Sequence, residues 1–345
     1  MQSIYSLDIE QLQDWLKENG QKPYRAKQIY NWLYKKRVSS FDEMSDLSHD
    51  FIEQLKNTFT MEPLQVLERQ VAKDQTTKYL FELEDGSSIE TVLMHFNFGK
   101  SVCVTSQVGC NMGCTFCASG LLKKQRNLTS GEMVNQVLMV QKELDEKEER
   151  VDNIVVMGTG EPFDNYEEVL RFCKIINSDL GLAIGARHIT ISTCGIVPMI
   201  ERFADEHYQY NLAISLHASN NELRDELMPI NKAYPIESLL SALRSYSIDN
   251  HRRLTIEYIL LKDVNDTEKN AKELAGLLKG MNAYVNLIPY NEVDENGYKA
   301  TDERGALHFY DTLMKNGVKA TLRSKHGDDI DAACGQLRAR RERKE

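Results

Sequence analysis

The stretch that decides the fold is Gln107-Val-Gly-Cys-Asn-Met-Gly-Cys-Thr-Phe-Cys117, which holds three cysteines in the spacing C-x3-C-x2-C. It follows an apolar, β-like segment at residues 101–105. Iron–sulfur cubanes are held by cysteine thiolates, normally four of them. A run of only three ligands, Cys110, Cys114 and Cys117, leaves one iron of such a cluster free to bind a group that is not protein.

A vacant iron is what radical S-adenosylmethionine (SAM) chemistry uses, and the motif in this context resembles the radical-SAM superfamily. Zinc is a weaker interpretation, because zinc sites usually take four ligands from paired sets and the sequence has no second paired set. Structural disulfides are disfavoured, since the chain has seven cysteines and no signal-like start, and intracellular thiols are normally reduced. Unrelated core cysteines are the least favoured interpretation.

Size and composition predict a globular protein. The 345 residues suffice for one large α/β domain and a smaller one, and 41% apolar and 27% charged residues are ordinary values. No apolar run reaches membrane-spanning length, so we expect a cytoplasmic protein without a membrane partner. A net charge of −10 would argue against a nucleic-acid partner if the basic groups were dispersed over the chain. It does not do so where they are clustered, because phosphates are contacted locally.

The basic groups are clustered. One set lies between residues 21 and 38, with tyrosines and a tryptophan interleaved, a second follows the cysteine run, and a third closes the chain. The three sets are Lys22, Arg25, Lys27, Lys35, Lys36 and Arg37; Lys123, Lys124 and Arg126; and Arg338, Arg340, Arg341, Arg343 and Lys344. Aromatic and basic residues together suit stacking and phosphate contact on RNA. The alternative is an amphipathic helix, which we favour for Tyr30, Leu33 and Tyr34.

The periodicity divides the chain into four segments. Residues 1–62 read as a small helical accessory domain that contacts RNA, with helices over 8–18, 26–35 and 48–59 and a turn at 41–44. Residues 63–99 alternate with period two and predict a β-hairpin extension, with strands over 66–71, 77–83 and 88–95. Residues 100–325 form the core, and residues 326–345 form a C-terminal tail.

The core alternates strands with helices, which implies a parallel sheet with right-handed crossovers. We predict an α/β fold, a partial (β/α)6 TIM-like barrel. Its strands are expected over 102–106, 153–157, 188–192, 211–216, 254–260, 284–288 and 319–323. Its helices are expected over 130–144, 166–177, 197–204, 236–245, 268–279 and 302–316.

Barrel enzymes place their chemistry at the carboxyl ends of the strands. The cysteine run, Gly158-Thr-Gly-Glu161-Pro and Pro289-Tyr-Asn291 follow strands, while Ser192-Thr193 and Ser215-Leu-His217 close them. Unusual polar and glycine-containing segments thus fall where an active site is expected.

These segments match the groups of SAM. Gly158 and Gly160 permit close approach of backbone to a ligand, and Glu161 can accept a hydrogen bond from an amino group; the alternative is a strand-to-helix turn. Ser192, Ser215 and Asn291 offer hydrogen bonds to a ribose or carboxylate, or else cap strand ends. His217 contacts a cofactor or is a satisfied core histidine.

Four cysteines lie outside the run. Cys334, followed by Gly335 in a polar tail, is placed to reach back into the barrel mouth. Cys103 borders the site on the first core strand. Cys173 has apolar helical neighbours and is predicted to be core, whereas the role of Cys194 stays open.

The combination resembles the RlmN/Cfr radical-SAM methyltransferases, which methylate adenine in 23S ribosomal RNA. The likeness spans nearly the whole chain. It is carried by the segments Ser106–Ser119, Met157–Pro162, Ile191–Thr193, Ser215–His217, Leu287–Asn291 and Gly327–Gln336.

The resemblance implies one [4Fe-4S] cluster on the three run cysteines and two SAM molecules consumed per methylation. One SAM methylates Cys334, and a second is cleaved to a 5′-deoxyadenosyl radical that activates the S-methyl group for addition to adenine. Cys103 then attacks the Cys334 sulfur and releases methylated RNA, leaving a disulfide. Glu90 matches the general base, although from the residues alone it reads as an exposed strand carboxylate. The implied SAM-binding residues are Gly160, Glu161, Ser192, Ser215, Leu216, His217 and Asn291.

Two residues depart from the family pattern: Thr159 stands between the glycines where methionine is usual, and Cys194 stands where a small non-thiol residue is common. The Gly160-Glu161-Pro162 triplet resembles the branch that methylates C2 and often also a tRNA adenosine beside the anticodon. Methylation of C8 is the alternative, followed by a radical-SAM enzyme on a non-RNA substrate and a non-enzymatic zinc protein that binds RNA. We expect a monomer that uses an external electron donor.

Overall fold

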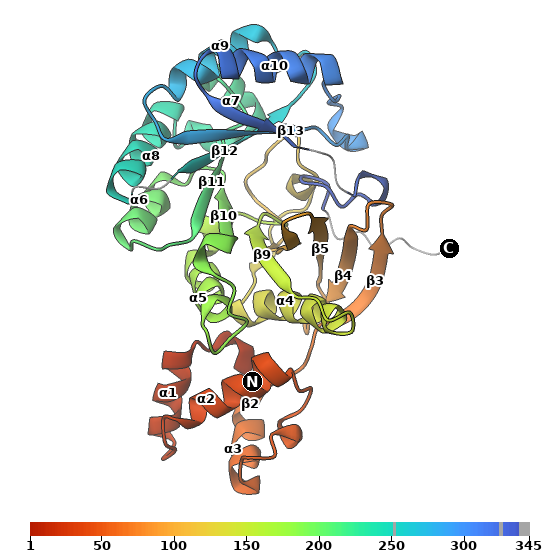
Figure 1. The fold of residues 1–345 in the computed structure, drawn as a ribbon, viewed down its shortest axis with the longest axis vertical. Coiled ribbons are helices and arrows are strands. Elements are labelled where there is room, and N and C mark those ends of the chain that lie inside the picture. The colour runs from red at the N-terminus through yellow and green to blue at the C-terminus, as the bar shows by residue number, and fades with distance from the viewer. Residues whose placement is uncertain (251–252, 324–326, 338–345) are drawn as a thin grey trace.

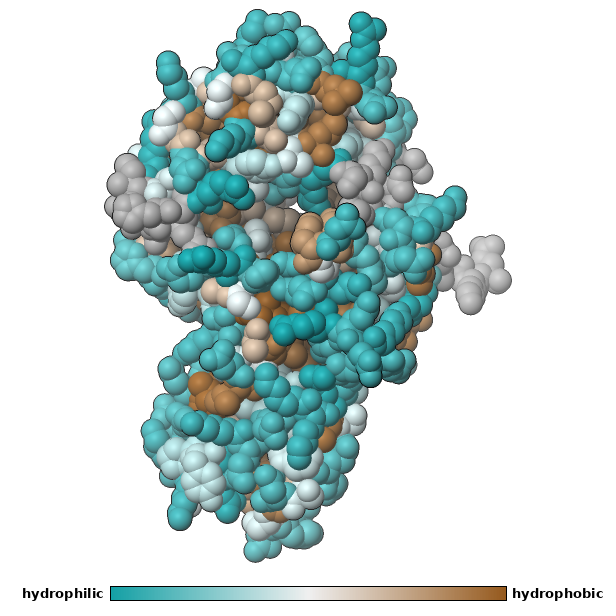
Figure 2. Space-filling view, in the orientation of Figure 1, coloured by the Kyte–Doolittle hydropathy of each residue, from teal (hydrophilic) through white to brown (hydrophobic). Residues whose placement is uncertain are grey.

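The computed structural model describes residues 1–250, 253–323 and 327–337, and Figure 1 shows their arrangement. A helical N-terminal unit lies at the bottom of Figure 1, below a curved sheet that is covered by helices. The face drawn in Figure 2 is hydrophilic over most of its area, with small apolar patches. Within the described residues, no helix is both long and apolar enough to cross a membrane.

The N-terminal unit is helical, as predicted. Its elements are α1 (Ile9–Glu18), α2 (Arg25–Tyr30), a π-helical turn (Asn31–Lys36), a 3-10 turn (Phe41–Glu43) and α3 (His49–Thr58). Asp8 begins α1 with a capping box, in which its carboxylate accepts the backbone N–H groups of Glu10 and Gln11. The single helix predicted over 26–35 is wrong in detail, because the chain changes to π-helical geometry at Asn31.

One ten-stranded sheet runs through the rest of the chain in the order β14-β13-β12-β11-β10-β9-β6-β5-β4-β3. Its parallel part is β6 (Gly99–Cys103), β9 (Val151–Val156), β10 (Ile189–Thr193), β11 (Asn211–Ser215), β12 (Leu254–Leu260), β13 (Ala283–Pro289) and β14 (Lys319–Leu322). The helices between them are α4 (Ser130–Asp145), α5 (Tyr166–Asn177), α6 (Val197–Asp205), α8 (Ile236–Asn250), α9 (Glu268–Leu277) and α10 (Glu303–Lys315), with α7 (Asn221–Leu227) before α8.

Six strand–helix units in sequential order confirm the predicted partial (β/α)6 barrel. Strand order in space follows order in the chain, and β14 and β3 are the two edges, so the described sheet stays open. The antiparallel strands β3 (Gln65–Val71), β4 (Thr77–Glu82) and β5 (Ser88–Phe96) continue this sheet beyond β6.

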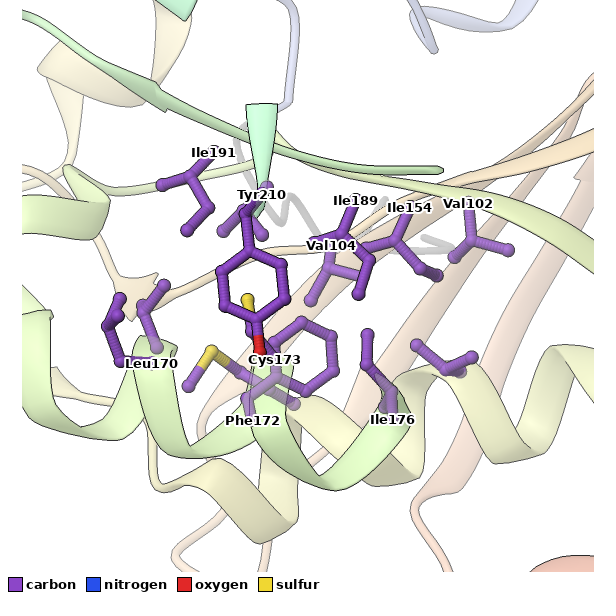
Figure 3. Packing of buried hydrophobic residues seen from close by; sticks show 14 of the residues in the cluster. Val102, Val104, Ile154, Leu170, Phe172, Cys173, Ile176, Ile189, Ile191 and Tyr210 are labelled. Carbon is purple, nitrogen blue, oxygen red and sulfur yellow. The ribbon is translucent and has the colours of Figure 1, made fainter. Parts of the chain in front are cut away.

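The core lies between the sheet and its helices. Figure 3 shows Phe172, Cys173 and Ile176 of α5 packed against Ile154 and Ile189 of the strands, all fully buried. Burying apolar side chains on one face of each helix is the main stabilising term of such a layer. The prediction that Cys173 belongs to the core is confirmed.

Polar contacts join the N-terminal unit to the core. Arg37 donates from Nε and Nη2 to the carboxylate of Asp145 on α4, at 2.5 and 2.7 Å. Lys174 of α5 pairs with Asp8 at 3.1 Å and with Glu10 at 2.7 Å. These bonds place the helical unit against the carboxyl end of α4 and the side of α5.

Candidate active site

The three run cysteines sit on a loop between β7 (Gln107–Val108) and β8 (Arg126–Asn127), which pair with each other. Gly109 enters the loop with φ +74°, and a Cβ there would lie 2.3 Å from the carbonyl oxygen of Lys123, so only glycine fits. The backbone N–H of Cys110 donates to Leu122 O, which closes the loop. Cys110, Cys114 and Cys117 all line one cavity of about 150 Å³, which we call the cysteine cavity.

Most of the predicted SAM residues line the same cavity. They are Gly160, Glu161, Ser192, Ser215 and His217, and Cys194 and Cys334 are beside them. Leu216 is buried but is not in the lining, and its carbonyl accepts a hydrogen bond from Arg224. Asn291 lies in a neighbouring cavity instead. Five of the seven residues that were predicted to bind SAM therefore lie together around the cysteine cavity.

The glycine segment after β9 approaches the chain's own backbone. A Cβ on Gly158 would lie 2.6 Å from Thr105 Oγ1, and one on Gly160, at φ +112°, would lie 2.6 Å from Gln107 Cβ. This packing brings Glu161 into the cavity wall. The strand-to-turn interpretation of the glycines is thus correct, and this turn brings the Glu161 carboxylate to the cavity.

Both carboxylate oxygens of Glu161 already accept backbone hydrogen bonds. Oε1 accepts the N–H of Phe163 at 2.9 Å, and Oε2 accepts the N–H of Cys194 at 2.7 Å. Burial raises the pKa of this carboxyl above its ordinary value, and these hydrogen bonds oppose that rise. Each oxygen has a second lone pair, so the carboxylate keeps acceptor capacity for a ligand in the cavity.

His217 is buried as a neutral ring. Its Nδ1 accepts the backbone N–H of Ile259 at 3.0 Å, so Nε2 carries the proton, and the ring stands edge-on to Phe116. Burial, helped by the nearby Arg224 charge, lowers its pKa to about 3. The residue has φ +54° at the end of β11, which turns the ring into the cavity.

Arg224 of α7 was missed by the sequence analysis. It is fully buried and donates to Cys194 O at 2.6 Å, Asn231 Oδ1 at 3.0 Å and Leu216 O at 3.3 Å. A fourth, longer contact of 3.4 Å reaches Ser215 O. Arg224 therefore ties together the ends of β10 and β11. Nothing in its local sequence marks it, because its acceptors are three backbone carbonyls and the side chain of Asn231, which come from separate segments of the chain.

A second cavity, of about 600 Å³, occupies the inside of the barrel, and we call it the barrel cavity. Cys103 lines it, and Cys334 lines both cavities. Nη1 of Arg323 lies 3.8 Å from Cys334 Sγ. Burial, and then the neighbouring Cys334, raise the pKa of the Cys103 thiol well above its ordinary value. All seven cysteines are free thiols in this structure.

Glu257 of β12 is a further residue the sequence analysis missed. It is buried, lines both cavities, and accepts from Asn286 Nδ2 at 2.9 Å. The sequence did contain a sign of it, because Glu257 is the one carboxylate inside the apolar strand Leu254–Leu260. Such a residue is most often kept buried by a polar partner.

Glu90 lies on β5 and lines neither cavity. Reading it as an exposed carboxylate was wrong, because it is only 5% exposed and its Oε1 lies 3.4 Å from Lys78 Nζ. The same Nζ donates to the carbonyl of Asp331 in the tail. Residues two apart share a face of a strand, so Glu90 is on the face of Val92, which packs in one apolar cluster with Cys103.

Parts of the predicted RNA-binding sets have internal partners. Arg25 stacks over Phe51, Arg37 binds Asp145, Lys124 pairs with Asp164, and Arg126 pairs with Asp85 and Glu132. Tyr30, Leu33 and Tyr34 are buried, which confirms the amphipathic alternative for them. Lys22, Lys27, Lys35, Lys36 and Lys123 remain exposed. The set from Arg338 to Lys344 lies outside the described residues.

The cysteine loop fits a cluster better than a single ion. In the ranges that the structure describes, no three His, Cys, Asp or Glu side chains stand close enough to hold one metal ion. A zinc site needs four ligands around a single centre, whereas a four-iron cubane takes each thiolate on a separate iron. Three thiols on one loop, facing serines and a carboxylate across a cavity, suit a cluster with a SAM molecule beside it.

Comparison with known proteins assigns the family. Residues 104–275 match the radical SAM superfamily, and residues 2–61 match the ribosomal RNA large subunit methyltransferase N-terminal domain. "Probable dual-specificity RNA methyltransferase RlmN" of Streptococcus thermophilus is 57% identical over 98% of this chain and 88% of its own length. The protein of the same name from Enterococcus faecalis is 55% identical over 100% of this chain and 98% of its own length.

A solved structure agrees with these relatives. The crystal structure of a radical SAM methyltransferase from Sphaerobacter thermophilus superposes with a TM-score of 0.94, at 42% identity, over 99% of this chain and 100% of that one. The family uses a [4Fe-4S] cluster and SAM, which the cysteine cavity fits. The chain is a SAM-dependent RNA methyltransferase that belongs to the RlmN family of radical SAM enzymes.

Proposed function

We propose that the protein methylates C2 of a specific adenosine in 23S rRNA, at the peptidyl-transferase centre, and an anticodon-adjacent adenosine in some tRNAs. The observation that carries this proposal is the position of Cys334, which borders the cysteine cavity on one side and the barrel cavity, with Cys103, on the other. A methyl carrier must reach a SAM site and an RNA site in turn, and Cys334 is in contact with both spaces.

The cofactor groups are assigned to the cysteine cavity. Cys110, Cys114 and Cys117 hold the cluster, and Glu161, Ser192 and Ser215 bind polar groups of SAM with support from Gly160, Leu216, His217 and Asn291. When bound, cluster and SAM supply a 5′-deoxyadenosyl radical, which removes hydrogen from an S-methyl group. The apolar walls of the cavity, including Met112, Met228 and Ile259, keep water from that radical.

The protein's own thiols carry the methyl transfer. Cys334 accepts a methyl group from the first SAM, and the activated carbon on its sulfur forms a bond to C2 of adenine. The radical adduct formed in this way would give up one electron, to the cluster that spent one electron in cleaving SAM, and Glu90 takes the proton from C2. The thiolate of Cys103 attacks the Cys334 sulfur, the carbon–sulfur bond breaks, and the released carbon takes a proton to become the methyl group. An external donor of two electrons then reduces the disulfide.

The assignment of Glu90 rests on the family resemblance, because its side chain lines neither cavity. The carboxylate is linked through Lys78 Nζ to the carbonyl of Asp331, three residues before Cys334. We assign residues 1–62 to RNA contact, through the exposed Lys22, Lys27, Lys35 and Lys36. Residues 63–99 are assigned as an extension that carries Glu90, residues 100–325 as the catalytic core, and residues 326–345 as the methyl-carrying tail. We propose a cytoplasmic monomer.

Anaerobic protein with reconstituted cluster, SAM, a reductant and an rRNA fragment tests the proposal. Mass spectrometry of nucleosides should show 2-methyladenosine, and an 8-methyl product would overturn the assignment of the carbon. Cys334→Ala should give neither product nor covalent adduct. Cys103→Ala should trap a protein–RNA adduct on a denaturing gel, whereas Cys173→Ala, buried in α5 away from both cavities, should behave as wild type.

A further inference from the structure

An exposed pair of aromatic rings marks the turn between β5 and β6. Phe96 ends β5, and its ring stacks on that of Phe98 with centroids 4.8 Å apart and planes 7° from parallel. Phe98 is 72% exposed. A large apolar side chain held flat against a partner and open to water contributes little to the core, and it presents a ready-made surface for another planar group.

Both rings line the barrel cavity, together with Cys103 and Cys334. The charged residues that line this cavity are Arg187, Arg253, Arg323 and Glu257, with His188 beside them. The carboxylate of Glu257 accepts a hydrogen bond from Asn286. Arg187 and Arg253 are exposed and lie just before the amino ends of β10 and β12, at the end of the barrel away from the cysteine loop. The wall is therefore basic in a protein whose net charge is −10.

One side-chain amide in the same cavity has a buried atom without a hydrogen-bond partner among the described residues. This atom is Asn153 Nδ2, a donor, whereas Asn153 Oδ1 is bonded to His188 Nδ1 at 2.8 Å. A buried polar atom without a partner costs about 1 to 3 kcal/mol, so such atoms usually serve a ligand or a water molecule. The volume, about 600 Å³, is within the range of sites that enclose one nucleotide-sized ligand.

We propose that the barrel cavity binds one nucleotide of single-stranded RNA that flanks the reacting adenosine, with Phe98 stacking the flanking base and Arg187 and Arg253 contacting phosphates. Asn153 Nδ2 donates a hydrogen bond to the nucleotide inside. The inference rests on the function proposed above for Cys334 and adds the residues that select unpaired RNA. Single-stranded RNA is recognised by stacking on aromatic rings combined with basic contacts to the backbone, and duplex RNA cannot offer an unstacked base.

The test is RNA affinity, measured by fluorescence anisotropy on the anaerobic holoprotein with a labelled single-stranded oligonucleotide that contains the target adenosine. Phe98→Ala should weaken binding roughly 5- to 150-fold, the range seen when a base loses its aromatic partner. Phe98→Tyr should retain wild-type affinity. Leu307→Ala, which removes another exposed apolar side chain (47%) on α10, is the control and should change nothing.

An oligonucleotide with an abasic flanking position separates stacking from other effects. Wild type and Phe98→Ala should bind it equally, because the base that Phe98 contacts is missing. Arg253→Gln should weaken binding to both oligonucleotides and make it less dependent on salt. If Phe98→Ala binds the intact oligonucleotide as tightly as wild type, or loses the same factor on abasic and duplex RNA, the inference is wrong.

This measurement is independent of the methylation assay. A wild-type protein that binds RNA through Phe98 but makes no 2-methyladenosine would overturn the proposed function and leave the RNA site standing. If instead the wild-type protein makes 2-methyladenosine and Phe98→Ala has unchanged RNA affinity and unchanged KM, the RNA site is overturned and the proposed function stands.

Discussion

Replacing Arg224 with methionine tests how the SAM-facing strand ends are held. Arg224 is fully buried and bridges Cys194 O at the end of β10 to Leu216 O after β11, through one guanidinium. Methionine fills much of the same volume and donates no hydrogen bond. The variant therefore removes the bridge and leaves its acceptors in place.

The magnitude follows from two opposing effects. The two shorter bonds, to Cys194 O at 2.6 Å and Asn231 Oδ1 at 3.0 Å, are charge-assisted and contribute about 1.5 to 3 kcal/mol each. Methionine also avoids the cost of burying a charge, which offsets part of this loss. We expect a net loss of about 2 to 4 kcal/mol in unfolding free energy. For 345 residues the unfolding entropy is about 0.7 kcal/mol/K, so Tm should fall by about 3 to 6 °C.

The assay is thermal unfolding of the anaerobic apoprotein by circular dichroism, followed by SAM affinity of the holoprotein. Arg202→Met is the matched control, because this exposed arginine of α6 bonds Glu206 at 2.8 Å and Glu167 at 2.5 Å and should be replaceable without effect. If Arg224→Met melts at the wild-type temperature and binds SAM normally, the guanidinium does not hold the two strand ends, and the reasoning fails.

Three other perturbations have definite expected outcomes. Gly160→Ala should lower the unfolding free energy and SAM affinity, because φ is +112° and a Cβ would lie 2.6 Å from Gln107 Cβ. Its control is Gly276→Ala, in open space on α9, which should raise the unfolding free energy by about 0.5 to 1 kcal/mol in urea titrations. His217 has a pKa of about 3 in the folded protein, so between pH 3 and pH 6.5 it takes up a proton only on unfolding. Its contribution to the unfolding free energy is therefore complete above about pH 6.5 and falls by about 1.4 kcal/mol per pH unit below it. His217→Asn should flatten that slope in unfolding measured between pH 7 and 5, and an unchanged slope would contradict the buried neutral ring. Alanine at any of the three loop cysteines should abolish the iron content and visible absorbance, while Cys173→Ala should keep both.

The strands show where sequence patterns suffice. Leu254–Leu260 was predicted with the bounds that the structure has, because an apolar run between charged segments marks a buried parallel strand. The first core strand was placed three residues too late. It ends at Cys103, because Gln136 of α4 bonds both the N–H and the carbonyl of Thr105 and takes them out of the ladder. That contact joins residues 31 apart and leaves no local signal.

The candidate site divides in the same way. That the loop cysteines, Glu161 and Cys334 lie around one cavity could be predicted, since their spacing or their position after a strand is visible in the chain. Arg224 could not, because its four acceptors come from three separate segments. Glu90 was recognised only by resemblance, since its burial depends on Lys78 of the neighbouring strand and on the tail.

The tail and the cysteine loop form one unit, and this connection explains how a thiol at position 334 can serve two cavities. The N–H of Ala118, directly after Cys117, donates to Gly335 O at 2.7 Å, and Ser119 Oγ donates to Leu337 O at 2.8 Å. On the other side, the N–H of Gly327 bonds Asp74 in the turn before β4 at 3.3 Å. A segment held at both ends, with its cysteine between the anchors, keeps that sulfur at the border of the cysteine cavity and the barrel cavity. The loop that carries Cys110, Cys114 and Cys117 therefore also positions Cys334, so the three loop cysteines and a cysteine distant in the chain lie around one cavity.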